Sequence, residues 1–218
     1  MKHAILLALG LICAAPSLAA ADCTAKRDPA ITVTVLEQPI AQDQAYSRHA
    51  LSERVGGVGP GWQAFGLTEA SHATEVHYGF QIVEQGRKFC ATLTSVTATI
   101  TLRLTVHLAS ELQRGSCAYL AVAEHEQQHV DLERRSLPLA RARVEQAITG
   151  VARRGVMAKS IDAATAGLEK AASRAVEQAL DRFAAEKNRK HAAFDTQEEY
   201  TKLSQRCSES EIRALLDQ

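Results

Sequence analysis

The stretch ATLTSVTATITLRLTVHLA, residues 91–109, alternates threonine and other β-branched residues with small or apolar residues along most of its length. Alternation with a period of two is typical of a β-strand that has one buried and one solvent-facing side. We expect this run to form a hairpin. Shorter runs of the same kind, Ile31–Val35 and Thr74–Val83, extend the β-rich region over residues 30–109.

From Glu111 onward the composition is that of helices, because alanine, glutamate, glutamine, arginine and leucine dominate and glycine is sparse. One helix is expected over about Cys117–Arg135, with a continuation past Pro138 to about Ile148. A second is expected over about Ser160–Lys190, before a short polar tail. Apolar residues recur along this second helix at three-to-four spacing and indicate a face that packs on the first helix. They are Ile161, Thr165, Leu168, Ala172, Val176, Ala179 and Phe183.

These patterns predict an α+β fold, in which an N-terminal antiparallel β region is followed by two long helices. The first 21 residues, MKHAILLALGLICAAPSLAAA, have a basic start, an apolar stretch and small residues at Ala19 and Ala21. This is the pattern of a secretory signal peptide that is cleaved after Ala21. Residues 22–218 are then expected to form one domain, β-rich over 30–109 and helical over 111–218.

An exported protein without a membrane anchor, either periplasmic or secreted, is therefore expected. The charges balance, with 25 basic and 25 acidic residues, so nothing suggests a nucleic-acid partner. The cysteines that remain after cleavage are even in number, which predicts two disulfides in an oxidising compartment. Three pairings are open among Cys23, Cys90, Cys117 and Cys207.

The first predicted helix carries His125-Glu126-Gln127-Gln128-His129, the HExxH pattern of zinc hydrolases. Positions four apart share one face of a helix, so His125 and His129 can bind one Zn²⁺ ion. Apolar residues flank this face, which favours burial of both imidazoles. Glu126 lies one step round the helix, where its carboxylate can reach a metal-bound water without displacing it.

A catalytic zinc site usually has three protein ligands, and the third is open. Glu133 follows His125 by eight residues, about 12 Å along a helix, so it cannot join both histidines on one ion. Glu133 and Asp131 are instead candidates to orient an imidazole by a hydrogen bond to the ring nitrogen that does not bind the metal. The third ligand is expected near the end of the second helix or in the tail. The candidates are His191, Asp195, Glu198, Glu199 and Tyr200.

The order of these features resembles a family of bacterial predicted secreted zinc-dependent proteases, a domain of unknown function. The likeness covers an early strand, the loop VGGVGPGWQAFG (55–66), the strand ATEVHYGFQIV (73–83), a cysteine-containing hairpin and the HExxH helix. The family tends to carry an aromatic–Asp pair followed, five residues after the Asp, by a histidine. Phe194–Asp195 fits the pair, and Tyr200 stands where the histidine would be, which leaves the third ligand open.

The motif and the resemblance together imply a zincin-like zinc metallopeptidase that acts on a peptide or protein substrate, with cell-envelope substrates as one option. In this reading Glu126 is the general base. The alternative is a non-catalytic envelope protein in which the HExxH helix is a structural metal site or plain core. A third reading is a binding module that docks a partner on the apolar face of the second helix.

Overall fold

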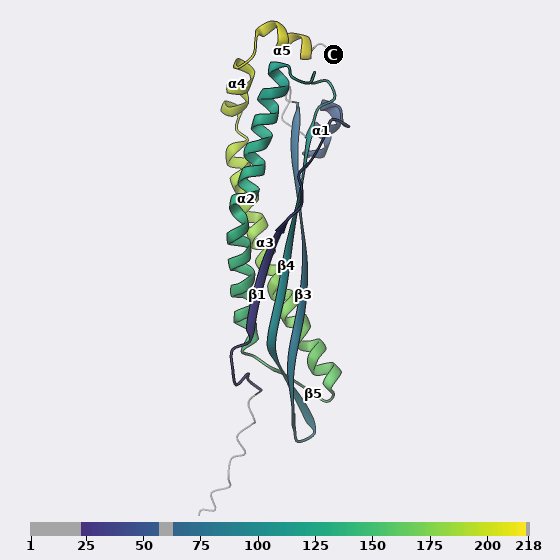
Figure 1. Ribbon diagram of the computed structural model, residues 1–218, viewed down its shortest axis with the longest axis vertical. Helices are drawn as coiled ribbons and strands as arrows, with labels where there is room; N and C mark the ends of the chain where they lie inside the picture. The colour runs from purple at the N-terminus through teal and green to yellow at the C-terminus, as the bar shows by residue number, and fades with distance from the viewer. Residues whose placement is uncertain (1–22, 57–62, 217–218) are drawn as a thin grey trace, which may run out of the picture.

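The computed structural model describes residues 23–56 and 63–216. Its elements form two layers, a long twisted sheet and a pair of long helices that run along one face of the sheet (Figure 1). This mixed composition is that of an α+β fold. The predicted signal peptide lies outside the described residues, as do residues 57–62 of the glycine-rich loop.

The run at residues 91–109 lies in a single strand, β4 (Lys88–Leu108), which pairs with all four other described strands. β3 (Gly66–Gln85) pairs with β4 in antiparallel register along nearly its whole length. The chain turns between them at Gly86, whose φ of +65° favours glycine. The prediction that residues 91–109 form a hairpin by themselves is wrong. They supply one arm only, because the turn lies before them.

The strands that precede this hairpin pair in the opposite sense from the prediction. β1 (Ala30–Glu37) and β2 (Ala41–Asp43) both run parallel to β4, so the prediction of an antiparallel N-terminal region is wrong for them. The reason is that β4 lies between β1 and β3, so β1 and β3 are not neighbours in the sheet. The short strand β5 (Val156–Ala158) pairs antiparallel with the start of β4.

The alternation in β4 sorts its side chains between the two faces of the sheet. The face under the helices is buried and apolar, and burial of each large aliphatic side chain contributes roughly 2 kcal/mol to stability. On the opposite face Thr97, Thr99 and Thr101 are exposed or half-buried. The buried set is Val96, Ala98, Ile100, Leu102, Leu104, Val106 and Leu108.

The long helices are α2 (Cys117–Ala152) and α3 (Ile161–Phe194). Each begins after a serine, Ser116 or Ser160, whose hydroxyl accepts a hydrogen bond from a first-turn amide. α2 continues through Pro138 as one helix of 36 residues. The chain reverses between them through β5, so α2 and α3 run antiparallel along the sheet (Figure 1).

The apolar face of α3 packs in the core rather than facing solvent. Leu168, Ala172 and Phe183 are at most 2% exposed, although Ile161 at the start of the helix is 45% exposed. The helix therefore presents no free apolar stripe for a docked partner, and the reading as a binding module loses its main support.

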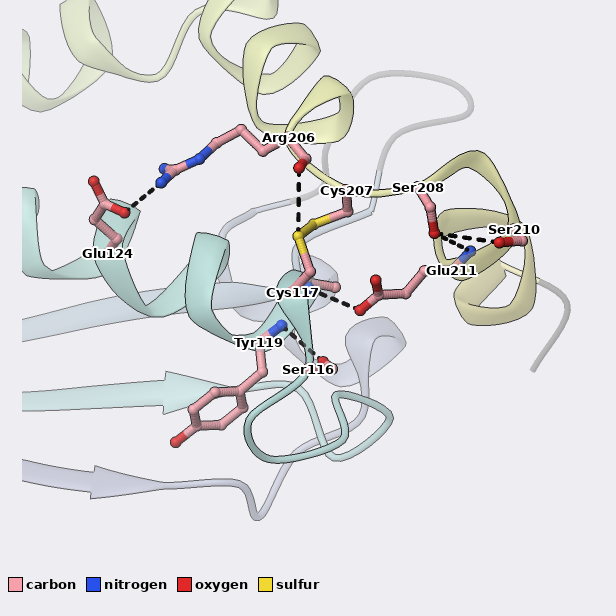
Figure 2. Close-up of a disulfide and its surroundings, with 10 residues drawn as sticks. Ser116, Cys117, Tyr119, Glu124, Arg206, Cys207, Ser208, Ser210 and Glu211 are labelled. Atoms are coloured by element: carbon pink, nitrogen blue, oxygen red, sulfur yellow. Dashed lines mark hydrogen bonds and ion pairs between the residues drawn. A yellow bond between two sulfur atoms is a disulfide. The ribbon is translucent and has the colours of Figure 1, made fainter.

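Two disulfides form, as the cysteine count predicts, and they join Cys23 to Cys90 and Cys117 to Cys207. The first joins the start of the described chain to β4. The second joins the first residue of α2 to the C-terminal segment (Figure 2). No helix in the described part of the chain is long and apolar enough to cross a membrane.

The predicted polar tail consists of two short helices, α4 (Gln197–Gln205) and α5 (Glu209–Leu216). α4 buries no residue and α5 buries only Leu215 among the described residues. Polar contacts hold this segment to α2 instead. Arg206, the residue before Cys207, pairs with Glu124 of α2 at 2.6 Å (Figure 2).

Replacing Cys117 and Cys207 together with serine is expected to lower the free energy of unfolding by about 2–4 kcal/mol, because the bridge closes a loop of 90 residues. The tail is then held by exposed ion pairs, each of which contributes less than about 1 kcal/mol, by the hydrogen bond from Arg48 to the carbonyl of Leu215, and by the burial of Leu215. Denaturant titration followed by circular dichroism measures the loss. Limited proteolysis measures release of α4 and α5.

The matched control replaces Cys23 and Cys90 with serine, which removes a bridge of similar span, 67 residues, at the other end of the sheet. This variant should lose stability but keep a protease-resistant tail. Equal resistance of α4 and α5 in both variants would contradict the role assigned to the second bridge.

Candidate metal and catalytic site

Two imidazoles from α2 meet at the candidate site. His125 and His129 lie one helical turn apart, and their Nε2 atoms are 3.2 Å from each other. Both residues are buried, with exposed fractions of 3% and 6%. Their shared direction follows from the four-residue spacing, as the sequence predicts.

Asp195, the C-cap residue of α3, completes a group of three atoms that could hold a metal ion. Its Oδ1 lies 3.2 Å from His125 Nε2 and 2.8 Å from His129 Nε2. Ligands that bind one tetrahedral zinc at 2.0–2.2 Å lie roughly 3.3 Å apart. The three atoms are therefore spaced closely enough to share one zinc ion, and Asp195, with 33% of its side chain exposed, leaves a path for water.

The charges at this group stabilise one another. Burial by itself would raise the pKa of Asp195, but hydrogen bonds from His125 and His129 prevail and hold that pKa well below its usual value. Burial likewise disfavours protonated His129, yet the hydrogen bond to Asp195 raises its pKa. Without a metal the group is thus a partly buried ion pair. A cation that binds there takes the place of a proton.

Glu198, Glu199 and His191, the other carboxylates and imidazole predicted as third ligands, contribute no atom to this group of three. Glu198 and Glu199 pair with Lys202, at 2.9 and 3.8 Å. Tyr200 lies closer, with its ring centroid 5.6 Å from that of His125. Burial, and then the charges of Asp195 and Glu126, raise the pKa of Tyr200, so its hydroxyl stays protonated and can donate a hydrogen bond.

Glu126 points to the strand side of α2. It is 4% exposed, and its Oε2 accepts a hydrogen bond from Thr68 Oγ1 of β3 at 2.7 Å. Gly66 lies against the same carboxyl group, and a Cβ atom there would overlap it. Burial raises the pKa of Glu126, while Thr68 and the two histidines oppose the shift. A carboxylate whose pKa is raised accepts a proton more readily than an ordinary one and can return it afterwards.

His191 lies behind His129 rather than among the ligand atoms. The two rings stack with centroids 5.0 Å apart, and their Nδ1 atoms are 2.7 Å from each other. On its far side, His191 Nε2 lies 2.9 Å from Glu133 Oε1. Glu133 therefore contacts an imidazole as expected, although that imidazole is not one of the HExxH pair. Asp131 instead accepts a hydrogen bond from Gln127.

Lys187, like Thr68, is a residue near the site that the sequence did not single out. It is 7% exposed, and its Nζ lies 2.7 Å from Glu133 Oε1. A signal was present, because Lys187 follows Phe183 by four residues and so continues the apolar face of α3. A lysine on a buried face requires a partner, and Glu133 supplies it.

Comparisons of the chain with protein-family models, with curated proteins and with solved structures find no significant match. The resemblance to secreted zinc-dependent proteases therefore stays a prediction. The geometry of the site is the basis for the function proposed below.

Proposed function

We propose that the chain is an exported zinc-dependent hydrolase, a metallopeptidase with a zincin-like arrangement of its HExxH helix. The observation that supports this most directly is the convergence of His125 Nε2, His129 Nε2 and Asp195 Oδ1 within 3.2 Å of one another. Three protein ligands with a solvent-accessible side are the usual composition of a catalytic zinc site. The two disulfides are compatible with a periplasmic or secreted location.

A zinc ion held by these residues would lower the pKa of a bound water towards about 7 and polarise a substrate carbonyl. Glu126 then accepts the proton of the attacking water and returns it to the leaving amine. Thr68 and Gly66 hold the Glu126 carboxyl group in place for both transfers. The ring of Tyr200 lies beside His125, and its protonated hydroxyl hydrogen-bonds with Asp195, so Tyr200 helps to hold that carboxylate at the site.

A peptide or protein is the substrate class that fits this chemistry, since both proton transfers serve cleavage of an amide bond. A cell-envelope peptide is one such substrate. The charge balance of the chain gives no reason to propose a nucleic-acid partner.

A non-catalytic envelope protein is the second candidate. It is favoured by the hydrogen bonds that the ionisable side chains make with one another. Asp195 contacts both histidines, and His129 also contacts His191. In that case the same residues bind zinc, or only each other, to fasten α3 to α2.

Metal removal separates these functions. The purified protein is expected to carry one zinc per chain and to hydrolyse peptides, and a chelator should abolish hydrolysis until zinc is restored. Zinc content is measured by mass spectrometry and hydrolysis on a quenched-fluorescence peptide library. Zinc binding that raises the melting temperature without any hydrolysis would favour the structural alternative. A protein that binds no zinc would overturn the metallopeptidase proposal.

A further inference from the structure

We propose that the end of the molecule at the β3–β4 turn docks on the surface of an anionic lipid membrane. This end consists of residues 23–30, 82–89 and 152–162, and we name it the hairpin end. It lies at the other end of α2 from the HExxH residues (Figure 1). Docking of this kind goes beyond the proposed hydrolase and does not depend on the metal site.

The three segments of the hairpin end are joined to one another by covalent and backbone contacts. The first disulfide joins Cys23 to Cys90, the residue that follows the β3–β4 turn segment. The amide of Gly155 donates a hydrogen bond to the carbonyl of Cys23. β5 pairs with residues 89–91 of β4. The three segments therefore form one structural unit.

Basic side chains predominate at the hairpin end, although the whole chain has no net charge. Among the described residues, only Arg153 of this basic set has an acidic partner, Asp28 at 2.9 Å. The excess of positive charge is complementary to a surface of anionic lipid head groups. The exposed basic residues are Lys26, Arg27, Arg87, Lys88, Arg153, Arg154 and Lys159, and the exposed acidic residues are Asp28, Glu84 and Asp162.

The opposite end of the molecule differs, because several of its basic side chains are paired with carboxylates. Arg54 lies 2.6 Å from Glu69, and Arg206 lies at the same distance from Glu124. Arg213 also pairs with a glutamate on its own helix. These pairs neutralise charge within the protein, whereas the unpaired basic side chains of the hairpin end are available to a partner.

Apolar side chains near the β3–β4 turn favour lipid over other anionic partners. Ile82 and Val83 are 38% and 44% exposed and lie within four residues of the turn at Gly86. Successive side chains of a strand face opposite sides, so the tip of the hairpin carries an apolar side chain on each side. A soluble polyanion would contact only the basic side chains, whereas a membrane interface accepts apolar and basic side chains together.

Docking through the hairpin end would direct the long axis of the molecule away from the membrane. The helical rise places His129 about 36 Å along α2 from Arg153, its C-cap residue. The candidate metal site would then lie in the aqueous space beside the membrane, within reach of peptides rather than of lipid.

Vesicle sedimentation tests the docking. The chain is purified after export and checked by intact mass to lack residues 1–21, because their apolar stretch would add a lipid contact of its own. It is mixed with vesicles of phosphatidylcholine, or of phosphatidylcholine and phosphatidylglycerol in equal parts. Binding to the anionic vesicles is expected to be at least about 10-fold stronger and to weaken as NaCl is added.

Two double substitutions separate the contributions of charge and apolar contact. Arg87→Gln with Lys88→Gln is expected to weaken binding to anionic vesicles by about 10–30-fold, because each basic residue near such a surface contributes roughly fivefold. Ile82→Ser with Val83→Ser is expected to weaken it by about 10-fold. Arg189→Gln with Lys190→Gln is the matched control, since it removes an exposed Arg–Lys pair from the other end of α3 and should leave binding unchanged.

Melting temperatures confirm that each variant is folded, which is expected because the substituted side chains are exposed. Failure of the wild-type protein to bind anionic vesicles would overturn the docking, as would equal losses in the Arg87–Lys88 and Arg189–Lys190 variants. Heparin provides a soluble polyanion for comparison. If the serine variant kept full vesicle binding and heparin bound as tightly as the vesicles, the partner would be a soluble polymer, and docking on lipid would be overturned.

Discussion

Replacing Glu126 with glutamine is expected to lower the turnover of peptide hydrolysis by about 10²–10⁴-fold while zinc stays bound. Glutamine has nearly the shape of glutamate and can still accept a hydrogen bond from Thr68. The packing of this side chain against Gly66 is therefore retained. What is lost is the ability to accept a proton from water and return it to the amine. The effect should therefore fall on kcat rather than on KM.

Glu145→Gln is the matched control, because it makes the same chemical change on an exposed part of the same helix. Zinc content and melting temperature of both variants should equal those of wild type. Hydrolysis that survives in Glu126→Gln with zinc bound would contradict the assignment of Glu126 as the base and would point to another proton acceptor.

The sequence predicts where strands of the sheet lie, but it does not predict which strands pair with each other. Alternation along β4 predicts which side chains are buried, and Val96 and Ile100 are both 0% exposed. Alternation does not say which strand is the neighbour. β1 runs parallel to β4 along one edge while β3 pairs with the other edge, and alternation along β4 is the same for a parallel and an antiparallel neighbour. That placement depends on packing across the whole sheet.

The site has a simpler basis in sequence than the fold. On α2, His125, His129 and Glu133 follow one another at four-residue intervals, and on α3 so do Lys187, His191 and Asp195. Because the helices are antiparallel, the two series face each other in opposite order. Asp195 meets the histidines and Lys187 meets Glu133.

Which of the candidate third ligands lies beside the histidines could not be predicted from the sequence, because it depends on where α3 ends. Asp195 caps the helix, and its amide bonds to the carbonyl of His191. Thr196 then starts α4 by accepting a hydrogen bond from the amide of Glu199, which turns the following residues into a new helix. Helix boundaries are the least certain part of a prediction from sequence, so the sequence could not say which carboxylate would lie beside the histidines.

Replacing Asp195 with alanine is expected to weaken zinc binding by about 10²–10³-fold. Four-ligand zinc sites bind with about 10–16 kcal/mol, which corresponds to about 2.5–4 kcal/mol for each ligand. The substitution also removes the carboxylate that raises the pKa of His129, so a smaller fraction of His129 is protonated at neutral pH. The second effect favours zinc, but it offsets only part of the loss because the bond to the metal is the larger contribution.

Asp181→Ala tests whether loss of any carboxylate from α3 has this effect, since Asp181 is exposed on the same helix. Tyr200→Phe removes the other nearby candidate ligand and keeps the ring beside His125. Both variants should bind zinc nearly as wild type does in a titration against a chromophoric chelator. If Tyr200→Phe lost zinc and Asp195→Ala kept it, the third ligand would be the phenolate. The hydrogen bonds of Asp195 to the two histidines would then be a feature of the metal-free protein alone, and zinc binding would require α4 to shift towards α2.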